Sequence, residues 1–186
     1  MKIIAIRRKR TVLATAGLLV AVLAVAGVSL AWTGHHHYRL GGGWIGSGSG
    51  SSWNCLTIPL DPAGQKSTVR VNIISYVTNF AEVLAYSGAD TVADYVGEGE
   101  MISGDTAKFT MVSYGLKQGN PPEIRQIWVD TGTWKYTGLD SADLNFNLAL
   151  YPAAADANGD GFPDPGATPF MTITNLTASA KRVPLP

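Results

Sequence analysis

The stretch Asp143-Leu-Asn-Phe-Asn-Leu-Ala-Leu150 decides the fold class, because apolar residues occupy every second position along it. Leu144, Phe146, Leu148 and Leu150 alternate with smaller or polar residues. Successive side chains of a β-strand point to opposite faces, so a period of two predicts a strand that buries one face. The pattern therefore favours a fold built from half-buried antiparallel strands.

Working outward from this stretch, we find further segments that favour strands. Some have the same alternation, and others are rich in the β-branched and aromatic residues that strands prefer. Glycine, proline, asparagine and aspartate, the residues of turns, separate many of these segments. The predicted strand segments are 55–60, 69–73, 124–137, 143–150 and 170–177, and the turn signals lie at 61–64, 103–105, 119–122 and 138–140.

The sequence thus predicts an all-β fold, an antiparallel meander of seven to eight strands with no internal repeat. Such a meander closes as a barrel or packs as a β-sandwich, and periodicity does not choose between them. One stretch differs: residues 79–96 carry Phe80, Val83 and Leu84 at helical spacing, with Gly88 as a stop. We expect a short helical insertion there, of one or two turns.

The N-terminus has the features of an export segment. Residues 1–10 carry five basic residues, and residues 11–32 carry no charge. An uncharged run of this length suits a membrane anchor, whereas the small residues around Ser29-Leu30-Ala31 suit a cleaved signal peptide. Residues 1–32 are therefore predicted to be a signal peptide or an N-terminal membrane anchor. The rest would lie on the outer face of the cytoplasmic membrane, in the periplasm or outside the cell.

Residues 33–52 are dominated by glycine and serine, a composition typical of flexible linkers. We expect a linker here, with a short first strand at 44–46, followed by a single β-rich domain over 53–186. His35-His36-His37 fall within this linker, where a solvated tract is favoured over a metal site because adjacent residues of a flexible chain lack a preorganised geometry.

Charge separates the two parts of the chain. The formal net charge is zero, but five of the 14 basic residues precede residue 11 and all 14 acidic residues follow residue 60. Beyond residue 10, nine basic residues therefore face 14 acidic ones, a net charge of −5. Since phosphate contacts need lysine and arginine, an acidic domain without basic clusters is not expected to bind nucleic acid.

Gly42-Gly43-Trp44 precede the predicted meander. A glycine, any residue and a tryptophan at the first strand, followed by an antiparallel meander, resemble the start of the lipocalin-like barrels. The resemblance covers most of residues 42–183 by layout. It implies a closed barrel with a pocket for a small apolar ligand, and it carries over no ligand-contacting residue.

The sharpest local motif is Asp156-Ala-Asn-Gly-Asp-Gly-Phe-Pro-Asp164, because oxygen-bearing residues alternate around glycines. Ca²⁺ takes six to eight hard oxygen ligands, which alternate positions of a tight loop can supply. The predicted ligands of a structural calcium ion are the side chains of Asp156, Asn158, Asp160 and Asp164 and the carbonyl of Phe162. The loop resembles the aspartate loops of thrombospondin type 3 repeats and the first nine positions of an EF-hand. Position twelve is Ala167 rather than a bidentate glutamate.

Other residues have weaker functional interpretations. Glu98 and Glu100 would share one face of a strand, where a solvated surface is favoured over an acid–base pair. Trp128, Trp134 and Tyr136 share parity, so they form either part of the core or an exposed platform for carbohydrate. The single cysteine, Cys55, is expected to be buried in a strand.

All three histidines precede residue 38, so the predicted domain holds none to act as a general base. The sequence therefore favours a non-enzymatic exported or membrane-anchored binding module with a structural calcium loop. The alternative is a lipocalin-like carrier of a small apolar ligand, and a hydrolase is the least favoured class. The sequence identifies no protein partner.

Overall fold

The alternating pattern folds into nine β-strands within residues 40–48, 51–75 and 83–184, which the computed structural model describes. A single 3-10 turn, η1, follows the eighth strand in the same residues. The strands are β1 (Gly42–Gly48), β2 (Ser51–Pro59), β3 (Lys66–Ser75), β4 (Thr91–Val92), β5 (Tyr95–Met101), β6 (Thr106–Lys117), β7 (Glu123–Gly138), β8 (Ser141–Pro152) and β9 (Met171–Arg182), and η1 spans Ala153–Ala155.

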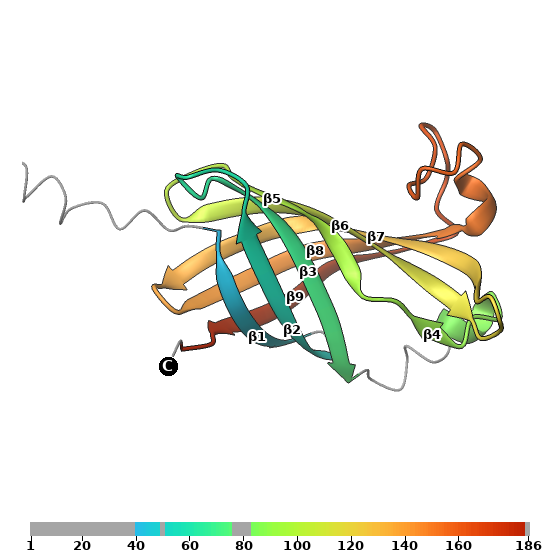
Figure 1. Ribbon diagram of the computed structural model, residues 1–186, viewed down its shortest axis with the longest axis horizontal. Coiled ribbons are helices and arrows are strands. Elements are labelled where there is room, and N and C mark those ends of the chain that lie inside the picture. Colours follow the sequence, from blue (N-terminus) through green and yellow to red (C-terminus); the bar gives the residue numbers. More distant parts are fainter. Residues whose placement is uncertain (1–39, 49–50, 76–82, 185–186) are drawn as a thin grey trace, which may run out of the picture. The chain divides into compact units, whose positions relative to one another are not determined.

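Eight of these strands close into an antiparallel barrel (Figure 1). Neighbouring barrel strands pair in sequence order, and β9 returns to pair with β1, which completes the cylinder. The two-residue β4 pairs with β6 beyond the end of β5. The predicted all-β meander is confirmed and the sandwich alternative is wrong, because both edges of β1 are hydrogen-bonded within one sheet.

The first strand corrects the predicted linker. The expectation placed a linker over 33–52 with a short strand at 44–46, but β1 occupies Gly42–Gly48 and β2 begins at Ser51. Glycine and serine serve close packing here. A Cβ at Gly46 would lie 2.1 Å from the Trp53 ring, and one at Gly48 would lie 2.3 Å from the backbone of Ala178. Small residues therefore let β1 approach its two neighbours.

The predicted helical insertion is confirmed in part. Residues 83–86 form one helical turn, which ends before Gly88 at a positive φ of 73°. The second half of the predicted range is extended, since β4 and the start of β5 lie within it. Pairing with the edge of β6 beyond β5 satisfies the backbone groups of β4 and overrides local helical preference.

Side chains of one parity point into the barrel and form its core. From β8, Leu144, Leu148 and Leu150 are buried, as the alternating stretch predicts. Val69 and Val71 of β3 face them across the interior. Burying side chains of this size contributes roughly 1.5–3 kcal/mol each relative to leaving them exposed, which is the main stabilisation of the barrel.

In β2 the inward parity falls on the less hydrophobic residues. Cys55 and Thr57 are buried, whereas Leu56 and Ile58 are about half exposed on the outer surface (49% and 54%). The pairing of β2 with β1 and β3 fixes this register, because a slip by one residue would turn every side chain to the opposite face.

The predicted turn at Asp61–Gly64 is present and leads into β3. The Asp61 carboxylate accepts hydrogen bonds from three backbone N–H groups, those of Ala63, Gln65 and Lys66. These bonds hold the pKa of Asp61 below its ordinary value.

The export segment lies outside the described residues, as do the three histidines. In the described ranges no helix is both long enough and apolar enough to cross a membrane.

Candidate functional site

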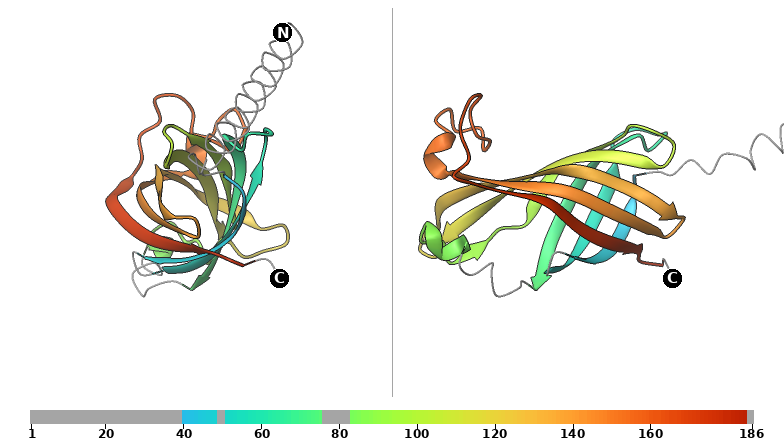
Figure 2. Two further views of the ribbon diagram at one scale, coloured as in Figure 1. Left: turned by 90° about the vertical axis from the view of Figure 1, so that its left-hand side faces the viewer. Right: turned by 180° about the vertical axis from the view of Figure 1, so that it is seen from behind.

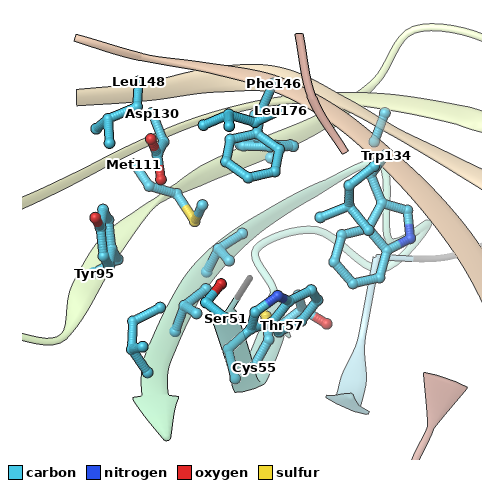
Figure 3. A pocket seen from close by; sticks show the side chains of 18 of the residues that line it. Ser51, Cys55, Thr57, Tyr95, Met111, Asp130, Trp134, Phe146, Leu148 and Leu176 are labelled. Carbon is cyan, nitrogen blue, oxygen red and sulfur yellow. The ribbon is translucent and has the colours of Figure 1, made fainter. Parts of the chain in front are cut away.

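The barrel encloses a cavity of about 270 Å³ whose walls are mostly apolar. Every barrel strand except β1 contributes at least one side chain to it, because alternate residues of each strand point inward. Figure 2 shows the strands arranged around this interior, and Figure 3 shows side chains that line the cavity. The lining residues are Leu40, Ser51, Trp53, Cys55, Thr57, Val69, Val71, Ile73, Val83, Tyr95, Gly99, Ala107, Lys108, Phe109, Met111, Asp130, Trp134, Leu144, Phe146, Leu148, Ile173 and Leu176.

A cluster of aromatic rings stands behind one part of the wall. Trp134 lines the cavity and meets Trp44 edge-on, with ring centroids 4.9 Å apart and an interplanar angle of 78°. The guanidinium of Arg182 lies over the Trp44 ring, 4.5 Å from its centroid, and donates a hydrogen bond to the carbonyl of Gly41. Edge-to-face and cation–π contacts of this kind stiffen the wall.

Asp130 is the exception to this apolar lining. Its side chain is 7% exposed, and Oδ1 has no hydrogen-bond partner among the described residues. Met111 of β6 and Leu148 of β8 are its register partners, and Figure 3 shows the carboxyl group between them, directed into the cavity. Burial alone raises the pKa of Asp130 to about 7, because the charged form loses its hydration.

The remaining polar groups of the lining include several that are already engaged. The hydroxyl of Thr57 donates to the carbonyl of Gly42, and the hydroxyl of Ser51 donates to that of Gly48. Lys108 points its ammonium outward, 3.0 Å from the carboxylate of Glu100. Burial raises the pKa of the Cys55 thiol to about 12, so this cysteine is a buried apolar group rather than a nucleophile.

The predicted calcium residues lie together in the loop between η1 and β9, outside the barrel wall and at one end of it (Figure 1). The loop is held to β6 by the Tyr114 hydroxyl, which donates to the carbonyl of Gly161 at 3.0 Å. Gly161 has a positive φ of 89°, and a Cβ there would lie 2.6 Å from the Tyr114 oxygen. Glycine is therefore required at this position for both conformation and space.

Within this loop the acidic side chains bind backbone amides. Asp156 Oδ1 accepts from the N–H groups of Gly159 and Asp160, and its Oδ2 accepts from Gly161. The backbone N–H of Phe162 donates to Asp160. Such bonds stabilise tight turns through short polar side chains.

The other two predicted ligands have similar roles. Asn158 Oδ1 accepts from the N–H of Asp160 and its amide donates to the Asp160 carboxylate, while Asp164 Oδ2 accepts from the N–H of Ala157. Nowhere in the described ranges do three histidine, cysteine, aspartate or glutamate side chains converge as a metal site. The calcium site stays a prediction, and each of the four predicted side-chain ligands has at least one oxygen bound to the loop's own backbone.

The weaker sequence candidates take structural positions. Glu98 and Glu100 lie on the outer face of β5, where Glu100 pairs with Lys66 and Lys108. Trp128, Trp134 and Tyr136 are buried, at 0%, 7% and 4% exposure. The core interpretation is confirmed for these three rings, and they offer no exposed platform for carbohydrate.

Asp130 is the residue that sequence reasoning missed. The alternating pattern of the sequence points to Asp130, because this residue shares the parity of Trp128 and Trp134 along a strand predicted to bury that face. A charged residue on a buried face is uncommon and marks a position with a special role.

Comparison with models of known protein families, with curated proteins and with solved structures found no match for this chain.

Proposed function

We propose that this protein binds a small apolar ligand inside its barrel and acts as a carrier or binding module rather than an enzyme. The observation that supports this most strongly is the cavity of about 270 Å³, walled by aliphatic and aromatic side chains. A well-formed apolar pocket with few polar groups is the usual form of a small-molecule site. An apolar cavity also holds water poorly, so a ligand there displaces little ordered solvent.

The size of the cavity limits the ligand. A cavity of about 150 Å³ takes up benzene, so by proportion one of about 270 Å³ suits a ligand of about ten non-hydrogen atoms. A medium-length alkyl chain or a fused two-ring skeleton meets this limit. Long-chain lipids exceed it.

The barrel form and the Gly42-Gly43-Trp44 start favour a lipocalin-like carrier over the other hypotheses from the sequence. Within this proposal the protein is exported, with residues 1–32 as its signal peptide or anchor. Its ligand would then be met on the outer side of the membrane. A structural calcium ion in the loop 156–164 would be an accessory feature remote from the cavity.

Ligand titration tests the proposal directly. Trp53 and Trp134 line the cavity, so their fluorescence reports on its contents. We expect 1-octanol and naphthalene to change the fluorescence of the full chain saturably and to raise its melting temperature. Native mass spectrometry of the purified chain gives a second readout of bound small molecules.

A matched pair of variants separates cavity binding from surface binding. Val71→Phe adds a ring inside the cavity, whereas Val96→Phe adds the same ring to the outer face of the neighbouring strand β5. We expect Val71→Phe to lose binding and Val96→Phe to retain it, with circular dichroism confirming that both variants fold. Absence of saturable binding to the wild-type chain, or equal binding by the two variants, would overturn the proposal.

A further inference from the structure

Two buried polar atoms of the described lining have no hydrogen-bond partner, Trp134 Nε1 and Asp130 Oδ1. Of these two groups, the Asp130 carboxyl is the one that can carry a charge. It is 7% exposed, lines the cavity and has no partner for Oδ1 among the described residues. A buried polar atom without a hydrogen bond costs free energy, and a buried charge without a counter-charge costs more. An aspartate at such a position indicates that its partner comes from outside the described residues.

Among the described residues, the surroundings of Asp130 supply no cation to pair with its carboxylate. Its neighbours in register, Met111 on β6 and Leu148 on β8, are apolar. The other titratable side chains of the lining are Cys55 on β2, Tyr95 on β5 and Lys108 on β6. The Lys108 ammonium pairs with Glu100 on the outer face, so no cation of the described lining neutralises Asp130.

The chemistry also excludes several ligand classes. A divalent metal needs several oxygen ligands, whereas Asp130 is the only carboxyl group among the described residues of the lining. Above neutrality, where Asp130 is ionised, an anionic ligand such as a fatty acid would place a second negative charge beside the first. A donor is required, and a cationic nitrogen supplies both a donor and the missing positive charge.

We propose that the ligand is a small amphiphilic amine, with an apolar skeleton of about eight to ten carbons set by the cavity, and that Asp130 binds its ammonium group. This inference rests on the proposed apolar-ligand function and deepens it by naming the head group. Asp130 then selects among ligands of equal apolar size, while the aliphatic and aromatic wall supplies most of the binding free energy. The charge-assisted hydrogen bond also neutralises the buried carboxylate.

The ionisation of Asp130 makes this selection depend on pH. Since burial raises the pKa of Asp130 to about 7, the carboxyl is neutral in mildly acidic solution and ionised above neutrality. An alkylamine stays cationic over the same range, because amines of this type titrate near pH 10 or above. The preference for an amine should therefore be strong at pH 8.5 and weak at pH 5.

Three probes of equal chain length test the proposal: octylamine, 1-octanol and octanoate, each titrated into the full chain at pH 8.5 and pH 5. At pH 8.5 we expect octylamine to bind at least about tenfold more tightly than 1-octanol. This affinity ratio corresponds to the free energy of one charge-assisted hydrogen bond. Octanoate should bind most weakly. In Asp130→Asn the preference for octylamine should disappear while 1-octanol still binds.

A measurement on the wild-type chain covers the case in which the variant does not fold. Carbon NMR of the Asp130 carboxyl, titrated with and without octylamine, should show that the amine lowers its pKa. An unchanged Asp130 titration in the presence of bound octylamine would overturn the assignment of Asp130.

The outcomes separate the two proposals. Binding of all three probes with similar affinity at pH 8.5 would overturn the amine inference and leave the apolar-ligand function intact. Failure of all three to bind would overturn both. Octylamine bound tightly by Asp130→Asn and wild type alike would show that the amine contacts another group, and it would contradict the inference.

Discussion

Asp130 and Asp156 are the same side chain in opposite surroundings. Asp156 lies in the loop after η1, where three backbone N–H groups donate to its two oxygens. Asp130 lies inside the barrel between apolar side chains, and its Oδ1 accepts no hydrogen bond from the described residues. The comparison teaches that a dense acidic motif is readily satisfied by its own turn. A solitary buried carboxyl needs a partner from elsewhere.

The largest effect on folding stability should come from replacing Asp130, the buried member of this pair, with a neutral residue. Between pH 4 and pH 7 the folded state keeps a proton on Asp130 that the unfolded state has released, because burial raises its pKa from 3.8 to about 7. Stability therefore falls as pH rises through this window and stays reduced above it. Asp130→Asn removes this dependence on pH. The effect of the substitution on the free energy of unfolding should therefore be more favourable at pH 8 than at pH 4, with a difference on the order of 2–4 kcal/mol.

Urea unfolding of wild type and Asp130→Asn at pH 4 and pH 8 measures this difference. Asp143→Asn, at an exposed position of β8, controls for the substitution itself. If Asp130→Asn changed the stability equally at the two pH values, the Asp130 carboxylate would have to be solvated or paired in the folded state, which would contradict the prediction.

The next largest effect should come from the loop. Asp156→Ala removes the acceptor for three backbone amides, and we expect it to destabilise the loop by about 1–3 kcal/mol. Limited proteolysis should then cut within 156–166 faster than in wild type, with Asp156→Asn intermediate because its amide oxygen still accepts. Equal resistance of wild type and Asp156→Ala would contradict a structural role for these bonds.

Calcium addition sharpens the same comparison. If the loop takes a structural ion with millimolar affinity, about ten-millimolar Ca²⁺ should stabilise the full chain by roughly 1.4 kcal/mol. We expect a rise of about 3–6 °C in melting temperature relative to chelator, and no rise in Asp160→Ala. Equal melting temperatures of the wild-type chain in calcium and in chelator would contradict the predicted calcium site in the loop.

The smallest effect should come from the outer face of the barrel. Glu100 pairs with Lys66 and Lys108, and these contacts hold its pKa below the ordinary value. The contribution of Glu100 to folding stability is present above its ordinary pKa and is lost as pH falls through its lowered pKa in the folded state. Because the pairs are solvent-exposed, we expect Glu100→Gln to leave the urea midpoint at pH 7 nearly unchanged. A large shift would mean that this face is buried in an assembly.

Many strands and turns of the barrel could be predicted because they depend on residues close together in the sequence. The alternation of Leu144, Phe146, Leu148 and Leu150 identifies a strand and its buried face without knowledge of any neighbour. The turn at Asp61–Gly64 follows from the chemistry of four consecutive residues. The helical turn lies within the predicted range and ends before Gly88, the predicted stop. Residues 91–92 of the same range are extended because β4 pairs with β6.

The sequence by itself determined the strand pattern and the all-β class, since side-chain alternation and turn chemistry act over a few residues. Only the tertiary structure decided that β9 pairs with β1, which turns a meander into a barrel with an interior. It also decided the surroundings of the two aspartates. Whether a carboxyl meets amides or apolar side chains depends on residues distant in the sequence, and closure of the barrel places Asp130 among them.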